Sequence, residues 1–133
     1  MKIIVCVDNK NGMLFNGRRQ SSDRIVCERV LKHTQNTGLW MNRYSAKLFK
    51  DPPYYLTVAE DFLDRCPADQ WCFVENTDIS QYRHKIRQVL LYRWNRTYPS
   101  DVTLPCLGLN EPDKVSEFAG NSHDLITEEL YIL

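Results

Sequence analysis

The chain begins with a short run of apolar, mostly β-branched residues that ends abruptly in a polar turn. Residues 2–7 have the sequence Lys-Ile-Ile-Val-Cys-Val, and the turn-forming sequence Asp-Asn-Lys-Asn-Gly follows at once. A strand with one face in water alternates apolar and polar residues, whereas an uninterrupted apolar run is typical of a strand covered on both faces. Such strands lie in the middle of parallel sheets that carry helices on both sides. This run therefore predicts an α/β architecture.

The residues after this run alternate between helical and extended patterns. Apolar spacings of three and four, polar N-cap residues and proline or glycine stops predict helices over residues 23–34, 46–49, 59–66 and 78–86. Aromatic and β-branched segments predict strands over residues 39–41, 54–58, 71–74 and 89–94. No helical pattern separates the last two predicted strands, which flank a polar loop and cover residues 114–118 and 126–133.

This order of elements defines the expected fold class. We expect a three-layer α/β domain whose mixed central sheet has about six to eight strands, mostly parallel, with an antiparallel C-terminal hairpin and helices on both faces. The length suits one domain, and no linker or repeat divides the chain, so a single domain over residues 1–133 is expected. In open sheets of this kind, ligands bind at the carboxyl ends of the parallel strands, here the loops after Val7, Met41 and Val74.

Charge, cysteine and histidine usage exclude several classes of protein. Seventeen basic and seventeen acidic residues cancel, so no overall charge draws the chain to nucleic acid or to an anionic membrane. The N-terminal apolar run is too short for a membrane span or a signal peptide. Five cysteines lack a Cys-x-x-Cys pair, and His33, His84 and His123 share no spacing that indicates a metal site or a nucleophile triad. We therefore expect a cytoplasmic protein with reduced thiols.

Three segments match one known family in the same order. The first strand leads to Gly12, residues 39–45 have the sequence Leu-Trp-Met-Asn-Arg-Tyr-Ser, and residues 89–92 begin a C-terminal third that continues through an acidic turn to the final hairpin. In this order the segments resemble the first strand, the cofactor-phosphate segment and the C-terminal strands of the dihydrofolate reductase family. The resemblance runs from one end of the chain to the other and implies the fold of that family.

The resemblance also implies roles for individual residues. Asp23 matches the carboxylate on the first helix that holds the substrate and helps to protonate it, since an acid can bind the edge of a heterocycle through two hydrogen bonds. Asp23 is equally placed to cap that helix. Arg43 and Ser45 match residues that help bind the adenosine phosphate of NADPH. Val5 matches a substrate contact, and Tyr92 takes the place of a threonine linked to the substrate acid.

Other parts of the predicted site depart from the family. Its apolar pair before the first helix is replaced by Arg18 and Arg19, which are able to contact an anionic substrate group. Its glycine-rich turn, which meets the cofactor pyrophosphate, is replaced by a turn that includes Glu75, Asn76 and Thr77. Side chains here keep a phosphate away from the backbone, and carboxylates repel it, so NADPH binding is weakened and the cofactor stays unassigned. The arginine expected for a folate tail is also missing, which makes folate a poor ligand.

These observations leave three functions open. The favoured one is a ligand-binding domain that holds a nucleotide or small heterocycle in the family's cleft without ordinary folate reduction. The second is an active NAD(P)H-dependent reductase with altered cofactor loops, for which Arg43 and Ser45 are the main support. The third is an RNA or protein interaction module, because residues 83–87 are mostly basic and residues 93–98 interleave arginine with aromatic side chains. The sequence leaves the oligomeric state unassigned.

Overall fold

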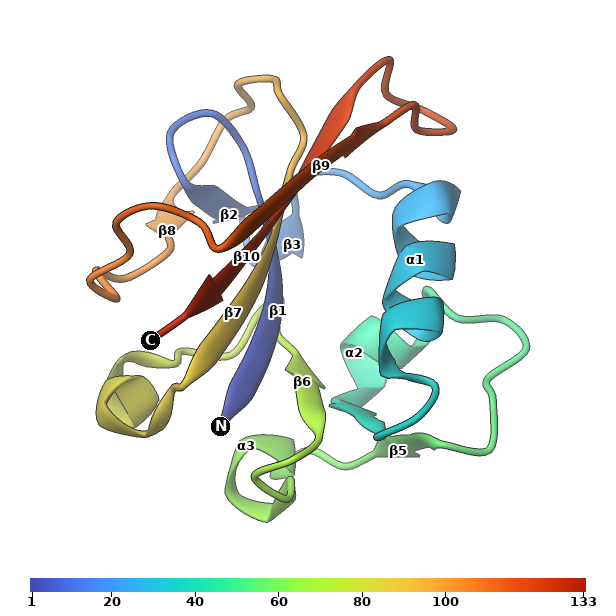
Figure 1. Cartoon of the computed structure of the whole chain (residues 1–133). Helices are drawn as coiled ribbons and strands as arrows, with labels where there is room; N and C mark the ends of the chain where they lie inside the picture. The colour runs from blue at the N-terminus through green and yellow to red at the C-terminus, as the bar shows by residue number, and fades with distance from the viewer.

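A twisted seven-stranded sheet lies at the centre of the protein (Figure 1). The computed structural model describes all residues, 1–133. In chain order the strands of this sheet are β1 (Lys2–Val7), β4 (Leu39–Met41), β5 (Leu56–Val58), β6 (Trp71–Phe73), β7 (Gln88–Arg93), β9 (Lys114–Phe118) and β10 (Ile126–Ile132). Their spatial order is β5-β4-β6-β1-β7-β10-β9, so β1 is the central strand. The prediction drawn from the N-terminal apolar run is confirmed.

The strand directions give the mixed sheet that the sequence predicts. β1 pairs in parallel with β6 and β7, and β4 pairs in parallel with β5 and β6. β10 runs antiparallel to both β7 and β9, which confirms the C-terminal hairpin. The parallel strands β1, β4, β6 and β7 therefore all end at the same edge of the sheet, and we refer to it as the carboxyl edge.

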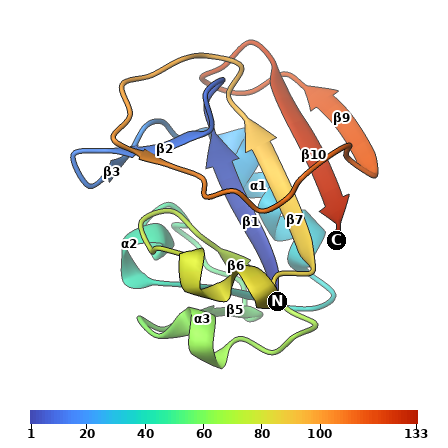
Figure 2. The same ribbon diagram turned by 90° about the vertical axis from the view of Figure 1, so that its left-hand side faces the viewer.

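Two hydrophobic cores cover the two faces of the sheet. α1 (Arg24–Thr34) and α2 (Arg43–Ala46) pack on one face, whereas α3 (Phe62–Arg65) and the 3-10 helix η1 (Ser80–Lys85) lie on the other (Figures 1 and 2). Successive side chains of a strand point to opposite faces. In β1, Val5 accordingly enters the core beside α3, and Ile4 enters the core under α1. A central strand that supplies two cores needs apolar residues at every position.

The shorter helices differ from the sequence prediction in their bounds. α1 is confirmed within one residue, but α2 begins at Arg43 rather than residue 46, because Asn42 caps it and accepts a hydrogen bond from the Ser45 backbone N–H at 3.1 Å. Of the helix predicted over residues 59–66, only Phe62–Arg65 is helical. Residues 78–86 contain a 3-10 helix instead of an α-helix. Helices of one or two turns have too few internal hydrogen bonds for sequence patterns to fix their type and ends.

A second, three-stranded sheet is missing from the prediction, which treats residues 12–20 as irregular. It consists of β2 (Gly12–Phe15), β3 (Arg18–Arg19) and β8 (Val102–Thr103), with β2 in the middle. Asn16 and Gly17 form the turn between β2 and β3 with φ angles of 53° and 72°. An Asn-Gly pair is the strongest local signal for such a hairpin, so the sequence did contain the information. The hairpin brings Arg19 toward the carboxyl edge.

Two further observations bear on the expected class of protein. No helix of the protein combines the length and the apolar character that crossing a membrane requires. All five cysteines are free thiols.

Candidate functional site

The carboxyl edge of the sheet carries a cluster of polar side chains that bind one another. Glu75 follows β6, Ser45 lies in α2, and Arg19 comes from β3. The Arg19 guanidinium meets the Glu75 carboxylate through two hydrogen bonds of 2.8 and 2.9 Å, and the Ser45 hydroxyl donates to the same carboxylate at 2.8 Å. Arg19 also lies over the ring of Tyr44, 4.3 Å from its centroid. We call these four residues the edge cluster.

The edge cluster is largely withdrawn from water. The Glu75 side chain is 8% exposed and that of Arg19 is 24% exposed. Burial lowers the pKa of Arg19, but the hydrogen bonds and charge of Glu75 outweigh it and raise that pKa overall. A planar guanidinium that meets a carboxylate through two bonds is the strongest common form of such a pair. The negative charge that Glu75 was expected to present is therefore neutralised inside the protein.

Hydrogen bonds between side chains also hold the turn after β6. The Asn42 side-chain amide donates to Asn76 Oδ1 at 2.8 Å and to Thr77 Oγ1 at 3.3 Å. The structure thus brings four of the five predicted cofactor residues, Ser45, Glu75, Asn76 and Thr77, to one place, but each is engaged by another side chain. The fifth, Arg43, is exposed, and its guanidinium has no hydrogen-bond or ion-pair partner.

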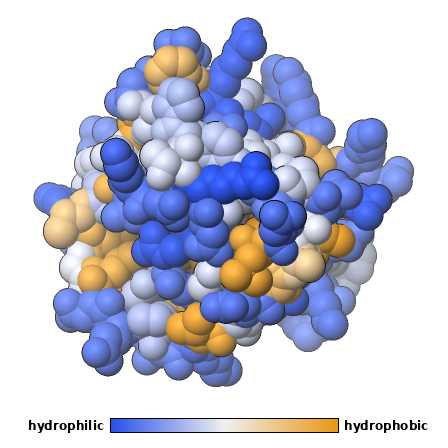
Figure 3. Space-filling model, turned by 90° about the horizontal axis from the view of Figure 1, so that it is seen from above, coloured by the Kyte–Doolittle hydropathy of each residue, from blue (hydrophilic) through white to orange (hydrophobic).

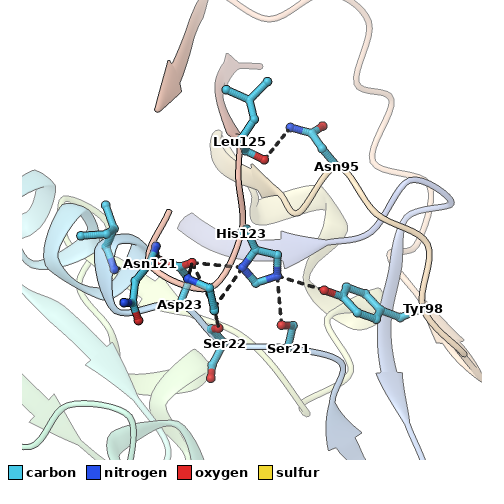
Figure 4. Close-up of polar contacts among 10 residues, drawn as sticks. Ser21, Ser22, Asp23, Asn95, Tyr98, Asn121, His123 and Leu125 are labelled. Atoms are coloured by element: carbon cyan, nitrogen blue, oxygen red, sulfur yellow. Dashed lines mark hydrogen bonds and ion pairs between the residues drawn. The ribbon is translucent and has the colours of Figure 1, made fainter. Parts of the chain in front are cut away.

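Asp23, the predicted catalytic acid, caps α1 and is fully occupied by donors (Figure 4). Its Oδ1 accepts from the backbone N–H groups of Ile25 at 2.9 Å and Asn121 at 3.0 Å. Its Oδ2 accepts from the Ser122 N–H at 2.8 Å and from His123 Nδ1 at 3.0 Å, and the Ser122 hydroxyl lies 3.2 Å away but donates over a shorter distance, 2.8 Å, to the Ser22 carbonyl oxygen. Burial opposes ionisation, but these hydrogen bonds prevail and hold the pKa of Asp23 well below its usual range. Asp23 is thus an ionised group without a free lone pair directed at a ligand.

His123 lies at the centre of the polar contacts around Asp23. Its Nε2 is 3.1 Å from Ser21 Oγ and 3.0 Å from the Tyr98 hydroxyl, and its ring stacks on Trp94 with centroids 4.6 Å apart. Because Asp23 is an acceptor, Nδ1 carries the proton, and in a neutral ring Nε2 then accepts from both hydroxyls. No local sequence pattern predicts this arrangement, because His123 lies one hundred residues from Asp23 along the chain.

The loop that carries His123 needs glycine where it approaches α1. A Cβ atom at Gly120 would lie 2.5 Å from Asp23 Oδ2 and 2.8 Å from the His123 carbonyl oxygen. The Gly120 N–H also donates to that carbonyl at 2.9 Å, which closes the loop. A larger residue at this position would push the loop away from the N-terminus of α1.

An open cleft of about 650 Å³ lies between α1, the segment after α2 and the loop at residues 121–122. Its apolar wall and floor consist of Cys27, Leu31, Leu48 and Phe49, and its remaining lining residues are polar or charged: Ser22, Asp23, Arg24, Glu28, Lys50, Asp51, Asn121 and Ser122. This volume falls in the range of small-molecule sites. Seen from above Figure 1, the protein surface is mainly hydrophilic, and its hydrophobic areas are separate from one another (Figure 3).

The thiol in the cleft is neutral at physiological pH. Burial, and then the carboxylates of Glu75 and Asp23, raise the pKa of Cys27 to about 11. Burial also raises the pKa of Cys6, which packs on the same side of the sheet. The floor of the cleft therefore offers a weak S–H donor and apolar surface, without a charge of its own.

The predicted substrate-binding residues are spread over several places. Val5 and Tyr92 are fully buried in the cores and do not line the cleft. Arg18 is exposed and lines a separate groove of about 500 Å³ together with Gln20 and Tyr98. Arg19 belongs to the edge cluster. No group of three or more His, Cys, Asp or Glu side chains in the protein has an arrangement that suits a metal ion.

Comparison with known proteins identifies the fold. No protein-family model matches the sequence, and no curated protein matches it. Among solved structures, the chain is similar to a dihydrofolate reductase from Enterococcus faecalis complexed with NADP(H) and RAB-propyl, with a TM-score of 0.69 and 10% sequence identity over 98% of this chain and 94% of that chain. The protein therefore has a dihydrofolate reductase-like fold, as the sequence motifs predict.

Proposed function

We propose that the protein binds a small heterocycle or a nucleotide in the cleft beside α1 and does not carry out ordinary folate reduction. The observation that carries the proposal is the contrast between this open cleft of about 650 Å³ and the edge cluster, where the polar side chains are hydrogen-bonded to one another. The solved structure with the similar fold is complexed with NADP(H), whereas the polar side chains of the edge cluster in this chain are paired with one another.

The chemistry of the cleft suits a flat ring with polar substituents. Cys27, Leu31, Leu48 and Phe49 offer apolar contact surface to a ring. The side chains of several rim residues make no hydrogen bond or ion pair within the protein and so remain available to a ligand: Ser22, Lys50, Asp51 and Asn121. A mostly apolar pocket with a few free polar groups is the usual form of a small-molecule site.

Two features argue against hydride transfer in the family's manner. A pyrophosphate at the carboxyl edge would have to separate Arg19 from Glu75, and this would leave a carboxylate beside the phosphate charges. Asp23 already accepts hydrogen bonds from three backbone N–H groups and from His123, so holding or protonating a heterocycle would require it to lose one of them. Cofactor binding at the carboxyl edge and protonation of a substrate by Asp23 would each require these contacts to break.

Active NAD(P)H-dependent reduction of another substrate is the second candidate. Arg43 supports it, because its exposed guanidinium is free to bind a phosphate group. The interaction with RNA has less support, since Trp94 is buried against His123 and Arg93 is paired with Glu129 at 2.8 Å. A cytoplasmic location, expected from the reduced thiols, is part of the proposal.

A thermal-shift screen followed by calorimetry tests the proposal. A ligand that binds only the folded protein raises its melting temperature. We expect a shift with a nucleobase, nucleotide or related heterocycle, and none with NADPH or folate. Leu31→Trp fills the cleft and should abolish this shift, whereas Leu125→Trp, at a site 44% exposed and outside the cleft, should retain it.

Two results would contradict ligand binding in the cleft. A shift that survives in a folded Leu31→Trp variant would locate the ligand elsewhere. A shift with NADPH, lost in Arg43→Ala, together with oxidation of NADPH in the presence of a reducible substrate, would favour the reductase.

A further inference from the structure

Ser21, His123 and Asp23 form a continuous relay of hydrogen bonds (Figure 4). Ser21 Oγ lies 3.1 Å from His123 Nε2, and His123 Nδ1 lies 3.0 Å from Asp23 Oδ2. A hydroxyl, an imidazole and a carboxylate in this order can activate a serine for nucleophilic attack on any scaffold. We propose that Ser21 is the nucleophile of an ester-hydrolysing site, with His123 as general base and Asp23 as its positioning residue. This activity does not depend on the occupant of the cleft.

The relay is held in the arrangement that the reaction needs. Asp23 fixes the proton of His123 on Nδ1, so the lone pair of Nε2 faces the hydroxyls of Ser21 and Tyr98 and can accept the proton of Ser21. Trp94 stacks on the imidazole with an interplanar angle of 19°, so the ring cannot turn freely. Hydrogen bonds from three backbone N–H groups, those of Ile25, Asn121 and Ser122, keep the Asp23 carboxylate in place. A base that is oriented before the substrate arrives needs no reorganisation during the reaction.

The Tyr98 hydroxyl is placed to stabilise the charge that develops on the substrate. It donates to the same Nε2 atom at 3.0 Å in the resting state. When Nε2 takes the proton of Ser21, it stops being an acceptor, and the Tyr98 O–H becomes free to donate to a neighbouring oxyanion. Ser21 and Tyr98 flank one nitrogen atom, so an acyl group on Ser21 lies within reach of this donor.

The steps conserve atoms and charge. Ser21 Oγ bonds to the ester carbonyl carbon as its proton passes to Nε2; the bond from that carbon to the leaving oxygen then breaks, and Nε2 returns the proton to give an alcohol. Water attacks the acyl-serine with His123 as base, and the serine hydroxyl is restored as the carboxylic acid leaves. Ester and water are converted to acid and alcohol, with no other reactant.

The surroundings of Ser21 indicate the kind of ester. Ser21 is partly exposed, and its neighbours Gln20 and Tyr98 line the groove of about 500 Å³ that also contains Arg18. This lining has no acidic residue, and Arg18 has no ion-pair partner. The groove therefore suits an ester that carries a negative charge, since Arg18 can bind a carboxylate or phosphate.

A purely structural role explains only part of this relay. Asp23 caps α1 and His123 ties the loop at residues 120–123 to it, and both would do so without Ser21. The Tyr98 hydroxyl alone already satisfies Nε2. The serine hydroxyl on Nε2 is the contact that the structural role does not require, so it is the one to test.

A fluorophosphonate probe, which forms a covalent bond only with an activated serine, gives the direct test. Mass spectrometry of the wild-type protein should find one adduct, located on Ser21 rather than on the adjacent Ser22. Ser21→Ala should remove it, whereas Ser116→Ala, which alters an exposed serine on β9, should not. His123→Gln should also prevent labelling, with folding verified by circular dichroism. If that variant does not fold, Tyr98→Phe should keep the adduct but lower the hydrolysis of phenyl acetate by roughly a hundredfold.

The charge preference is measured by comparing kcat/KM for 4-acetoxybenzoate and for phenyl acetate. We expect the anionic ester to be preferred, and Arg18→Gln to lower that preference by about tenfold, which corresponds to the loss of one ion-pair contact. Absence of an adduct on the wild-type protein, or labelling that persists in Ser21→Ala, would overturn the proposal. Equal rates for the two esters would overturn the assignment to anionic substrates.

Discussion

The edge cluster and the cleft lie in the same fold but differ in how far the protein satisfies its own polar groups. In the edge cluster, Glu75 accepts from Arg19 and Ser45 and is almost fully buried. In the cleft, the rim side chains of Ser22, Lys50 and Asn121 have no partner within the protein. Polar groups that are paired internally stabilise the fold, whereas unpaired groups around an apolar floor remain available to a ligand. This difference is the reason for placing the proposed ligand in the cleft.

The largest effect is expected from Glu75→Ala. The change leaves the Arg19 guanidinium three-quarters buried without its carboxylate, and breaking such a pair is costly because the remaining charge loses its partner. We expect the free energy of unfolding to fall by about 2–3 kcal/mol, measured by urea denaturation. Glu28→Ala, which breaks an exposed pair with Arg24, should cost less than about 0.5 kcal/mol. Equal losses in the two variants would show that the edge cluster is not a structural unit.

Acid should lower the free energy of unfolding, because two carboxylates accept several hydrogen bonds in the folded protein. Burial opposes ionisation of Asp23 and Asp8, but hydrogen bonds lower the pKa of both carboxyl groups in the folded protein, so the unfolded chain binds protons more readily. The donors to Asp8 include the backbone N–H groups of Gly12, Tyr98 and Lys10. Their contribution to stability is present above the unfolded pKa of about 3.9 and is lost as the pH falls below it. Urea denaturation between pH 7 and pH 3 should show this loss, and Asp23→Asn, although less stable at pH 7, should show a weaker dependence. A wild-type stability that stays constant over this range would contradict the assignment.

Leu48→Ala should separate binding from folding. Leu48 is half-buried in the wall of the cleft, so its truncation should cost about 1 kcal/mol of stability, less than in a sealed core. The same change removes ligand contact and should lower affinity several-fold in calorimetry with a ligand from the screen. Unchanged affinity in a folded Leu48→Ala protein would show that Leu48 does not contact the ligand.

The smallest effect concerns the rate of thiol alkylation. With a pKa raised to about 11, Cys27 should react with iodoacetamide at pH 8 far more slowly than the exposed Cys106, because only the thiolate attacks. At pH 10 Cys27 should become reactive, and a ligand in the cleft should protect it but not Cys106. Mass spectrometry after timed quenching measures both rates. Protection of both thiols, or of neither, would be inconsistent with binding in the cleft.

Local sequence patterns predict the scaffold better than the site. The apolar run of β1 and the hairpin of β9 and β10 are visible in the sequence because burial dictates residue type at consecutive positions. The turn at Asn16 and Gly17 also has a local signal, because an Asn-Gly pair favours a two-residue hairpin. The contacts of Asp23 with His123, and of Arg19 with Glu75, join residues far apart in the chain, and a single sequence contains no record of such pairs.

Binding in the cleft is tested most directly by mapping a bound ligand by NMR. The backbone amides of a protein labelled with nitrogen-15 would be followed during titration with the heterocycle or nucleotide selected by the thermal-shift screen. We predict the largest shifts at Cys27, Leu31 and Asn121, which line the cleft, with Ser45 and Asn76 unchanged. If the largest shifts occur at Ser45 and Asn76 instead, the ligand opens the edge cluster, and this result would contradict binding in the cleft.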